Sequence, residues 1–116
     1  MNTTDTGTSP VTLNNSSLTL LTLSLPPRQA DAITDWLLEQ GLPGFSSWTG
    51  WGHSNRIGHL SISEQIQGKQ NRTFVSLHLS DSQCREVIEN LHLAFSGFDI
   101  HYWVEALRAS GSLNSQ

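Results

Sequence analysis

Four short stretches of this chain alternate apolar and polar residues with a period of two, and this pattern constrains the fold more than any other feature. The clearest stretch is 72–79, in which Val75 and Leu77 alternate with Ser76 and His78. The same alternation occurs at 18–25, 44–51 and 98–105. Because successive side chains of a strand point to opposite faces of a sheet, the pattern predicts four β-strands.

Two segments between these strands carry apolar residues at helical spacing. The first, 28–40, follows Pro27, which suits the first position of a helix, and stops before Gly41, a typical helix-ending glycine. The second begins after Ser80, whose spacing from Gln83 is that of a capping box. Its apolar face comprises Cys84, Val87, Ile88, Leu91 and Phe95. Both segments are predicted to be amphipathic helices.

The predicted elements follow the order β-α-β-β-α-β, with a long loop between the second and third strands. This is the order of the ferredoxin-like α+β sandwich. Right-handed crossovers would place both helices on one face of a four-stranded sheet. We expect the domain to span 17–108, between a disordered tail at 1–16, which is rich in Thr, Ser and Asn, and a flexible tail at 109–116.

Composition argues against several classes of function. A net charge of −4 with only six Lys and Arg residues disfavours nucleic-acid binding. The longest apolar-leaning run, 18–25, is far below the roughly 20 residues of a membrane-spanning helix, and no signal-peptide pattern opens the chain. The single cysteine, Cys84, cannot form an internal disulfide, so we expect a cytoplasmic protein. No catalytic spacing is recognisable, and we expect a binding protein and not an enzyme.

The sheet face away from the helices would carry more large apolar side chains than a face in contact with water usually does. It collects Leu20 and the residues that we expect at an oligomer interface, namely Trp48, Phe74, His78, His101 and Trp103. The alternative is a register shift of one residue, which would move some of these side chains into the core. The two histidines are interpreted as interface or packing residues and not as metal ligands.

The loop after the second strand holds most of the candidate binding residues. Glycines let backbone N–H groups approach an anion closely, and nearby basic side chains could add charge. The candidate ligand-binding set is Gly50, Gly52, His53, Arg56, Gly58, Lys69 and Arg72. The alternative is that the glycines only permit a bend at the end of the strand.

Two further hypotheses concern the same loop. A metal site could form at His53 and His59, completed by the equivalent histidines of other copies, because imidazole suits zinc, copper and nickel. Residues 60–68 are interpreted either as a short helix that packs on the core or as a docking segment that orders when a partner binds.

The order of the elements together with this loop resembles the PII-like superfamily of nitrogen regulatory proteins. The glycine-containing stretch 50–59 is similar to the start of the T-loop in PII-type signalling proteins. An uncharacterised PII-like family of bacterial proteins, often encoded near heavy-metal efflux systems, is more similar still. The stretches that carry this resemblance are 35–38, 44–45, 50–53, 60–69 and 100–104.

The resemblance implies a homotrimer that binds a small anionic ligand, such as a nucleotide, in the clefts between subunits. The T-loop-like segment 52–70 would bind a protein partner, for example a membrane transporter. The related CutA divalent-ion tolerance proteins suggest the alternative of a divalent-metal-binding trimer connected with heavy-metal tolerance or efflux. The chain departs from the nucleotide-binding PII pattern because its only nearby basic residues are Arg56, Lys69, Arg72 and Arg108. The sensing of ATP and 2-oxoglutarate is therefore not carried over.

Overall fold

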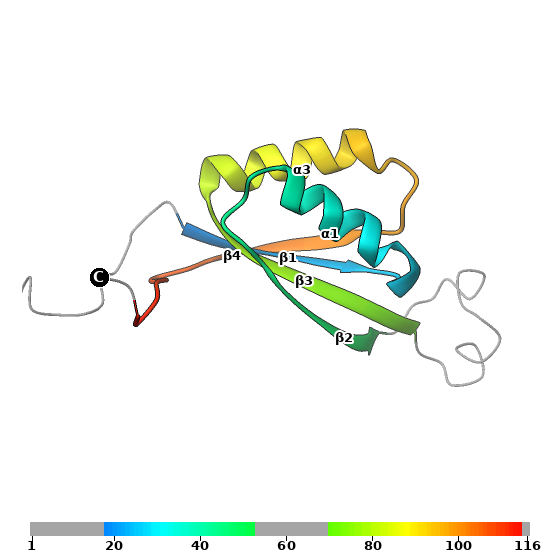
Figure 1. The fold of residues 1–116 in the computed structure, drawn as a ribbon, viewed down its shortest axis with the longest axis horizontal. Helices are drawn as coiled ribbons and strands as arrows, with labels where there is room; N and C mark the ends of the chain where they lie inside the picture. Colours follow the sequence, from blue (N-terminus) through cyan, green and yellow to red (C-terminus); the bar gives the residue numbers. More distant parts are fainter. Residues whose placement is uncertain (1–17, 53–69, 115–116) are drawn as a thin grey trace, which may run out of the picture.

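A computed structural model describes residues 18–52 and 70–114, which form one sheet with two helices packed on it (Figure 1). Along the chain the elements are β1 (Leu18–Leu25), the 3₁₀ turn η1 (Pro27–Gln29), α1 (Ala30–Glu39), β2 (Ser46–Gly52), β3 (Gln70–Ser80), α3 (Asp81–Ala94) and β4 (His101–Ala106). The strands lie in the order β2-β3-β1-β4, and every neighbouring pair is antiparallel. The chain is thus a small α+β fold with β3 and β1 at the centre of its sheet.

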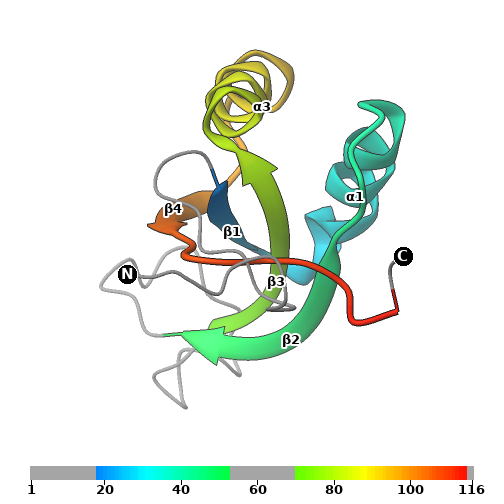
Figure 2. The ribbon, with the colours of Figure 1, turned by 90° about the vertical axis from the view of Figure 1, so that its left-hand side faces the viewer.

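Both helices lie on the same side of the sheet, and the core fills the space between these two layers (Figures 1 and 2). The β1 residues Leu21, Leu23 and Leu25 have no exposed surface. The register places Leu21 beside Leu77 and Leu23 beside Val75. The helices add Ile33, Leu37, Cys84, Val87 and Leu91 to the same cluster. Each fully buried leucine contributes roughly 1.5–3 kcal/mol relative to an exposed one.

The predicted signals at the helix ends are confirmed. Gly41 follows α1 with a positive φ of 70°, which glycine adopts without a steric penalty. At the start of α3, the Ser80 hydroxyl accepts the Gln83 N–H at 3.2 Å, and the Gln83 side-chain carbonyl accepts the Ser80 N–H at 3.1 Å. The first helix begins later than predicted, at residue 30, because the Gln29 N–H donates to the Pro26 carbonyl at 2.9 Å and forms the tighter turn η1 first.

The prediction that the fourth strand begins at residue 98 is wrong, since β4 begins at His101. Gly97 has a φ of 89°, which reverses the chain after α3. The Phe98 N–H then donates to the Phe95 carbonyl at 3.1 Å, and the Ile100 N–H donates to the Phe98 carbonyl at 3.0 Å. These bonds form a turn in place of extended backbone. Strand β2 likewise begins at residue 46 instead of 44 because Gly44 has a φ of 141°.

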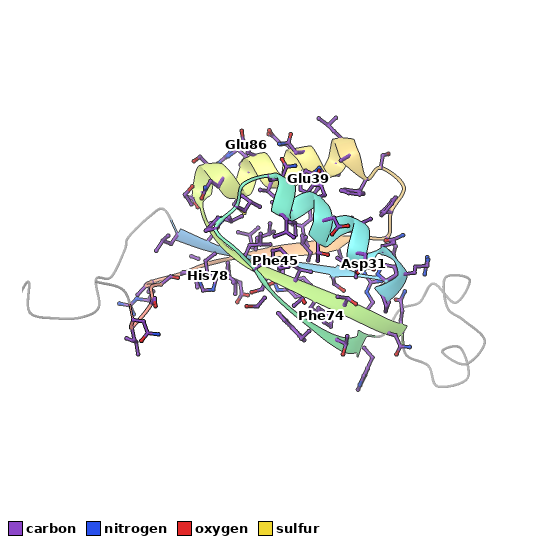
Figure 3. The ribbon with its side chains drawn as sticks, viewed as in Figure 1. Asp31, Glu39, Phe45, Phe74, His78 and Glu86 are labelled. Atoms are coloured by element: carbon purple, nitrogen blue, oxygen red, sulfur yellow. The ribbon has the colours of Figure 1, made fainter. Side chains whose placement is uncertain are left out.

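The strand register settles which side chains lie on the sheet face away from the helices, called the reverse face from here on. Trp48 pairs with Phe74, and Thr22 pairs with Trp103. Their neighbours along the strands, such as Leu23 and Val75, are fully buried under the helices. Figure 3 shows Phe74 on the side of the sheet opposite to the helices. The alternative of a register shift is therefore excluded.

The central strand should dominate the stability of the fold. We expect Leu23→Ala to lower the free energy of unfolding by about 2–5 kcal/mol, because it removes buried methyl groups and leaves a cavity. Urea unfolding monitored by circular dichroism measures the change. The matched control is Leu93→Ala on α3, where the side chain is 83% exposed and the expected change is within about 0.5 kcal/mol. Equal losses in the two variants would contradict this account of the core.

Candidate functional site

Three aromatic rings from three different strands form a row across the reverse face, called the aromatic row below. Trp48 of β2 stacks on Phe74 of β3, with ring centroids 5.6 Å apart and planes 18° from parallel. Phe74 meets Trp103 of β4 edge to face at 6.5 Å. The two tryptophans keep 48% and 43% of their surface exposed. The row therefore presents a broad apolar surface outside the core.

The row can cross β1 because β1 has small side chains on this face. Ser24 pairs with Phe74 on one side of β1, and Thr22 pairs with Trp103 on the other. Both small residues are buried, with 7% and 4% of their surface exposed. Large side chains at these two positions would separate the rings that flank β1. The polar residues of β1 thus make the contact between β3 and β4 possible.

Gly50 has a packing role next to the same row. A Cβ atom at this position would lie 2.9 Å from Cε2 of Phe74, closer than real Cβ contacts. The absence of a side chain at Gly50 lets the Phe74 ring lie over β2. Gly52, two residues later, differs because a Cβ there would lie 3.8 Å from Cγ of Arg72, an ordinary contact distance. Of these two predicted ligand-binding glycines, only Gly50 lies so close to Phe74 that a side chain there would force the ring to shift.

Arg72 connects three parts of the reverse face. Its Nε donates to the Ser24 hydroxyl at 2.9 Å, and Nη2 donates to the Ser24 carbonyl at 2.6 Å. Nη1 donates to the Asp99 carboxylate at 3.0 Å, and Nη2 also donates to the Asp99 carbonyl at 3.1 Å. The residue is only 4% exposed. Although Arg72 was predicted to bind a ligand, its guanidinium is used to join β3, β1 and the turn before β4.

Asp99 lies between Arg72 and His101. One carboxylate oxygen accepts from Arg72, and the other lies 3.1 Å from Nε2 of His101. Burial alone would raise the pKa of Asp99, but the hydrogen bond and charge of Arg72, together with His101 and Gln70, hold the pKa below its usual value. His101 is itself 63% exposed and remains accessible on the reverse face.

The structure separates the two histidines that were predicted together on this face. His101 pairs with Ser24, whereas His78 pairs with Leu20 toward the other end of β1. His78 is near the C-terminal segment, where its Nδ1 lies 2.7 Å from the Ser110 hydroxyl. Within residues 18–52 and 70–114, no group of three or more His, Cys, Asp or Glu side chains is placed to hold a metal ion.

Most of the predicted loop residues lie outside the described part of the chain. These are His53, Arg56, Gly58, His59 and Lys69, together with the segment 60–68. The structure does show the base from which the loop departs, where Gly52 pairs with Gln70. Gly50 pairs with Arg72 two residues further into the sheet. Three members of the predicted set, Gly50, Gly52 and Arg72, are therefore neighbours at the loop base.

Sequence reasoning missed a cavity of about 230 Å³ at the C-terminal end of α3. Its walls include Phe95 and His92 on the α3 side, and Phe98, Ile100 and Tyr102 on the β4 side, with Leu23 of the core also lining it. Phe98 and Tyr102 are 39% and 49% exposed. The cavity exists because the turn at 97–100 carries the chain away from the sheet before β4 begins. The alternation of residues at 98–105 predicted a strand there and therefore gave no indication of this turn.

Sequence reasoning also missed the role of Asp99, because the alternation at 98–105 assigned this residue to a strand.

We expect the free energy of unfolding to fall as the pH drops below the ordinary Asp pKa of 3.8, because the unfolded chain then binds a proton at Asp99 more readily than the folded chain does. Asp99→Asn should lower stability near pH 7 and reduce this acid dependence. The control is Asp35→Asn, which removes an exposed carboxylate from α1. Urea unfolding from pH 2 to pH 7 measures the free energy of unfolding of the wild type and of both variants. If Asp99→Asn lost as much stability at acid pH as the wild type does, this prediction would be wrong.

None of the helices in the described ranges is long and apolar enough to cross a membrane. No curated protein matches the chain. Among solved structures, the chain is similar to the crystal structure of a DUF3240 family protein from Shewanella baltica OS155. The two share 23% sequence identity and a TM-score of 0.69, over 85% of this chain and 99% of that one. This likeness supports the fold.

One protein-family model matches nearly the whole sequence. Residues 15–114 match the model described as "Protein of unknown function (DUF3240)". The match includes every described strand and helix, the aromatic row, Arg72 and Asp99. The chain therefore belongs to the DUF3240 family.

Proposed function

We propose that this chain is a PII-like regulatory subunit that assembles into a homotrimer through its reverse face and acts in the cytoplasm by binding and not by catalysis. The observation that carries the proposal is the aromatic row, with its two tryptophans nearly half exposed. Contiguous apolar patches of this kind usually mark an interaction surface. Aromatic residues are enriched and charged residues depleted in the centre of protein interfaces, as they are in this row.

The arrangement of the elements supports the assignment of the fold as ferredoxin-like. The strand order β2-β3-β1-β4, with both helices on one face, is the arrangement that a ferredoxin-like β-α-β-β-α-β domain requires. This arrangement leaves one sheet face without helices. In a PII-like trimer the three uncovered faces would meet around a central axis, and the aromatic rows would be buried there.

We place the small anionic ligand, such as a nucleotide, at the base of the segment 53–69. Gly52 is the residue that favours this position, because its lack of a side chain is not explained by packing. Arg72 is committed to Ser24 and Asp99, so the balancing positive charge would come from Arg56 and Lys69. The segment 52–70 would then contact a protein partner, and its conformation would depend on the bound ligand.

The assembly is tested by light scattering coupled to size-exclusion chromatography. We expect the wild-type chain to have three times its 12.8 kDa mass. Trp48→Lys and Trp103→Lys should each dissociate the trimer, because a charged side chain would be placed in an apolar interface. Leu38→Lys on α1 is the control, since Leu38 is 66% exposed on the helix side of the sheet and should leave the mass unchanged. A monomeric wild type at millimolar concentration would overturn the proposal.

The ligand site is tested by thermal unfolding with ATP and, separately, with Zn²⁺ or Cu²⁺. A ligand that binds only the folded state raises the unfolding temperature. We expect a shift of a few degrees with ATP at saturation, and its loss in Gly52→Ala, which the fold should tolerate. Leu38→Ala, which changes an exposed residue of α1, should retain the nucleotide shift. A metal shift that disappears in His53→Ala would instead favour the divalent-metal trimer, and no shift with ATP would refute nucleotide binding.

A further inference from the structure

We propose that the cavity between the C-terminal end of α3 and the start of β4 is a binding site for a small neutral aromatic molecule that carries one hydrogen-bonding group. This site is separate from the anion site proposed at the base of the segment 53–69, and it takes a ligand of a different chemical class. It also does not depend on the proposed homotrimer, because one chain supplies all of the walls described here.

The cavity lies where the chain leaves α3 and returns to the sheet. Ile88 and His92 of α3 and Phe95 just after it follow one another at spacings of four and three residues, which places them on one side of the helix. On β4, Tyr102 pairs with Leu23 of β1, whose side chain belongs to the core under the helices. Side chains from the helix and from the sheet thus form two walls of the cavity, on the helix side of the sheet.

The walls of the cavity are rich in aromatic rings. Phe95 and Phe98 meet edge to face, with ring centroids 5.0 Å apart and planes 61° from parallel. Phe98 and Tyr102 both line the cavity and both remain partly exposed, so the cavity is open to solvent beside these rings. Aromatic rings favour offset-stacked or edge-to-face contacts with another ring. A ligand ring in the cavity would therefore bury aromatic surface that the fold leaves uncovered.

The size of the cavity limits the ligand to one or two rings. Its volume of about 230 Å³ is below the roughly 300–1,000 Å³ of typical small-molecule pockets. An apolar protein cavity of about 150 Å³ is already large enough to bind benzene. A phenol or an indole is therefore compatible with the cavity, whereas a nucleotide, with its base, sugar and phosphates, is too large.

The polar groups of the cavity favour a ligand without charge. Among the described residues that line it, none is Asp, Glu, Lys or Arg. A carboxylate or a phosphate would therefore lose hydration there without gaining an opposite fixed charge. The cavity does contain the imidazole of His92 and the hydroxyl of Ser96, which can each donate or accept a hydrogen bond. A hydroxyl or a ring N–H on the ligand would find a partner in these groups.

Titration of the full chain with indole, followed by ¹⁵N–¹H correlation spectra, tests the site. We expect saturable binding with a dissociation constant of roughly 0.1–1 mM, which is typical of a ligand of this size. The largest shifts should occur at the backbone amides of 92–102, which include the turn and most of the cavity walls.

Matched substitutions place the ligand in the cavity. His92→Trp should weaken indole binding about tenfold, because the new side chain would compete for the cavity. Leu93→Trp is the control, since Leu93 is the next residue of α3, is exposed and does not line the cavity. Tyr102→Ala removes a ring from the wall and should weaken binding about fivefold. Val104→Ala, at an exposed position further along β4, should leave the dissociation constant unchanged.

The chemical class of the ligand is tested with p-cresol, toluene and benzoate. We expect p-cresol to bind roughly threefold to tenfold more tightly than toluene, because its hydroxyl group gains a hydrogen bond. Benzoate should bind more weakly than either, and ATP should not displace indole. Equal binding of p-cresol and toluene would contradict the hydrogen-bonding group, tighter binding of benzoate would contradict a neutral ligand, and displacement by ATP would contradict a separate site.

Several results would overturn the site itself. These are the absence of saturable shifts with both indole and p-cresol, shifts centred away from 92–102, and undiminished binding in both His92→Trp and Tyr102→Ala. If indole bound the Trp48→Lys variant but not the wild-type assembly, a neighbouring copy would occupy the cavity and the inference would be wrong. A monomeric wild-type chain that binds indole would refute the homotrimer and leave this site in place.

Discussion

The burial of β1 on both of its faces is the constraint on which the rest of the structure depends. Its leucines face the helices and form the centre of the core, while Thr22 and Ser24 face the other way and are almost as completely buried. A central strand covered on both sides needs apolar bulk on one side and compact polar groups on the other. Because Ser24 is small and polar, it accepts hydrogen bonds from Arg72 and leaves room for the ring of Phe74.

Arg72 and Asp99 extend this constraint to the turn before β4. A buried guanidinium is tolerated only when its donors find acceptors, and here Ser24 and Asp99 supply them. Removing one partner would leave a buried charge without compensation, which costs far more than the pair itself contributes. Asp99 lies two residues before His101, where β4 begins, so its position also affects where Ile100 and Tyr102 lie. The same contacts therefore position one edge of the sheet and one wall of the cavity.

The proposed assembly follows from what this arrangement leaves uncovered. The helices cover one face of the sheet, and the other face carries the aromatic row. Burial of that row around an axis would explain the exposed surface of Trp48 and Trp103. Because Trp48 and Gly52 belong to the same strand, the base of the segment 53–69 would then lie near a contact between subunits, where a ligand could influence the packing of neighbouring copies.

Period-two alternation and the signals at the helix ends were sufficient to predict the four strands, the two helices and the reverse-face residues, because these patterns depend on local geometry and on which side is buried. They did not predict the turn at Gly97 and Phe98, since a turn can carry the same alternation of apolar and polar residues as a strand. The glycines and basic residues near the loop led to the prediction that Gly50 and Arg72 bind a ligand, which stays a prediction. The sequence did not show that Phe74 lies over the glycine or that Ser24 accepts hydrogen bonds from the arginine. The sequence by itself determined the elements and their faces, through chain-local periodicity. Only the tertiary structure decided which polar residues pair inside the fold, because those pairs join positions that are distant along the chain.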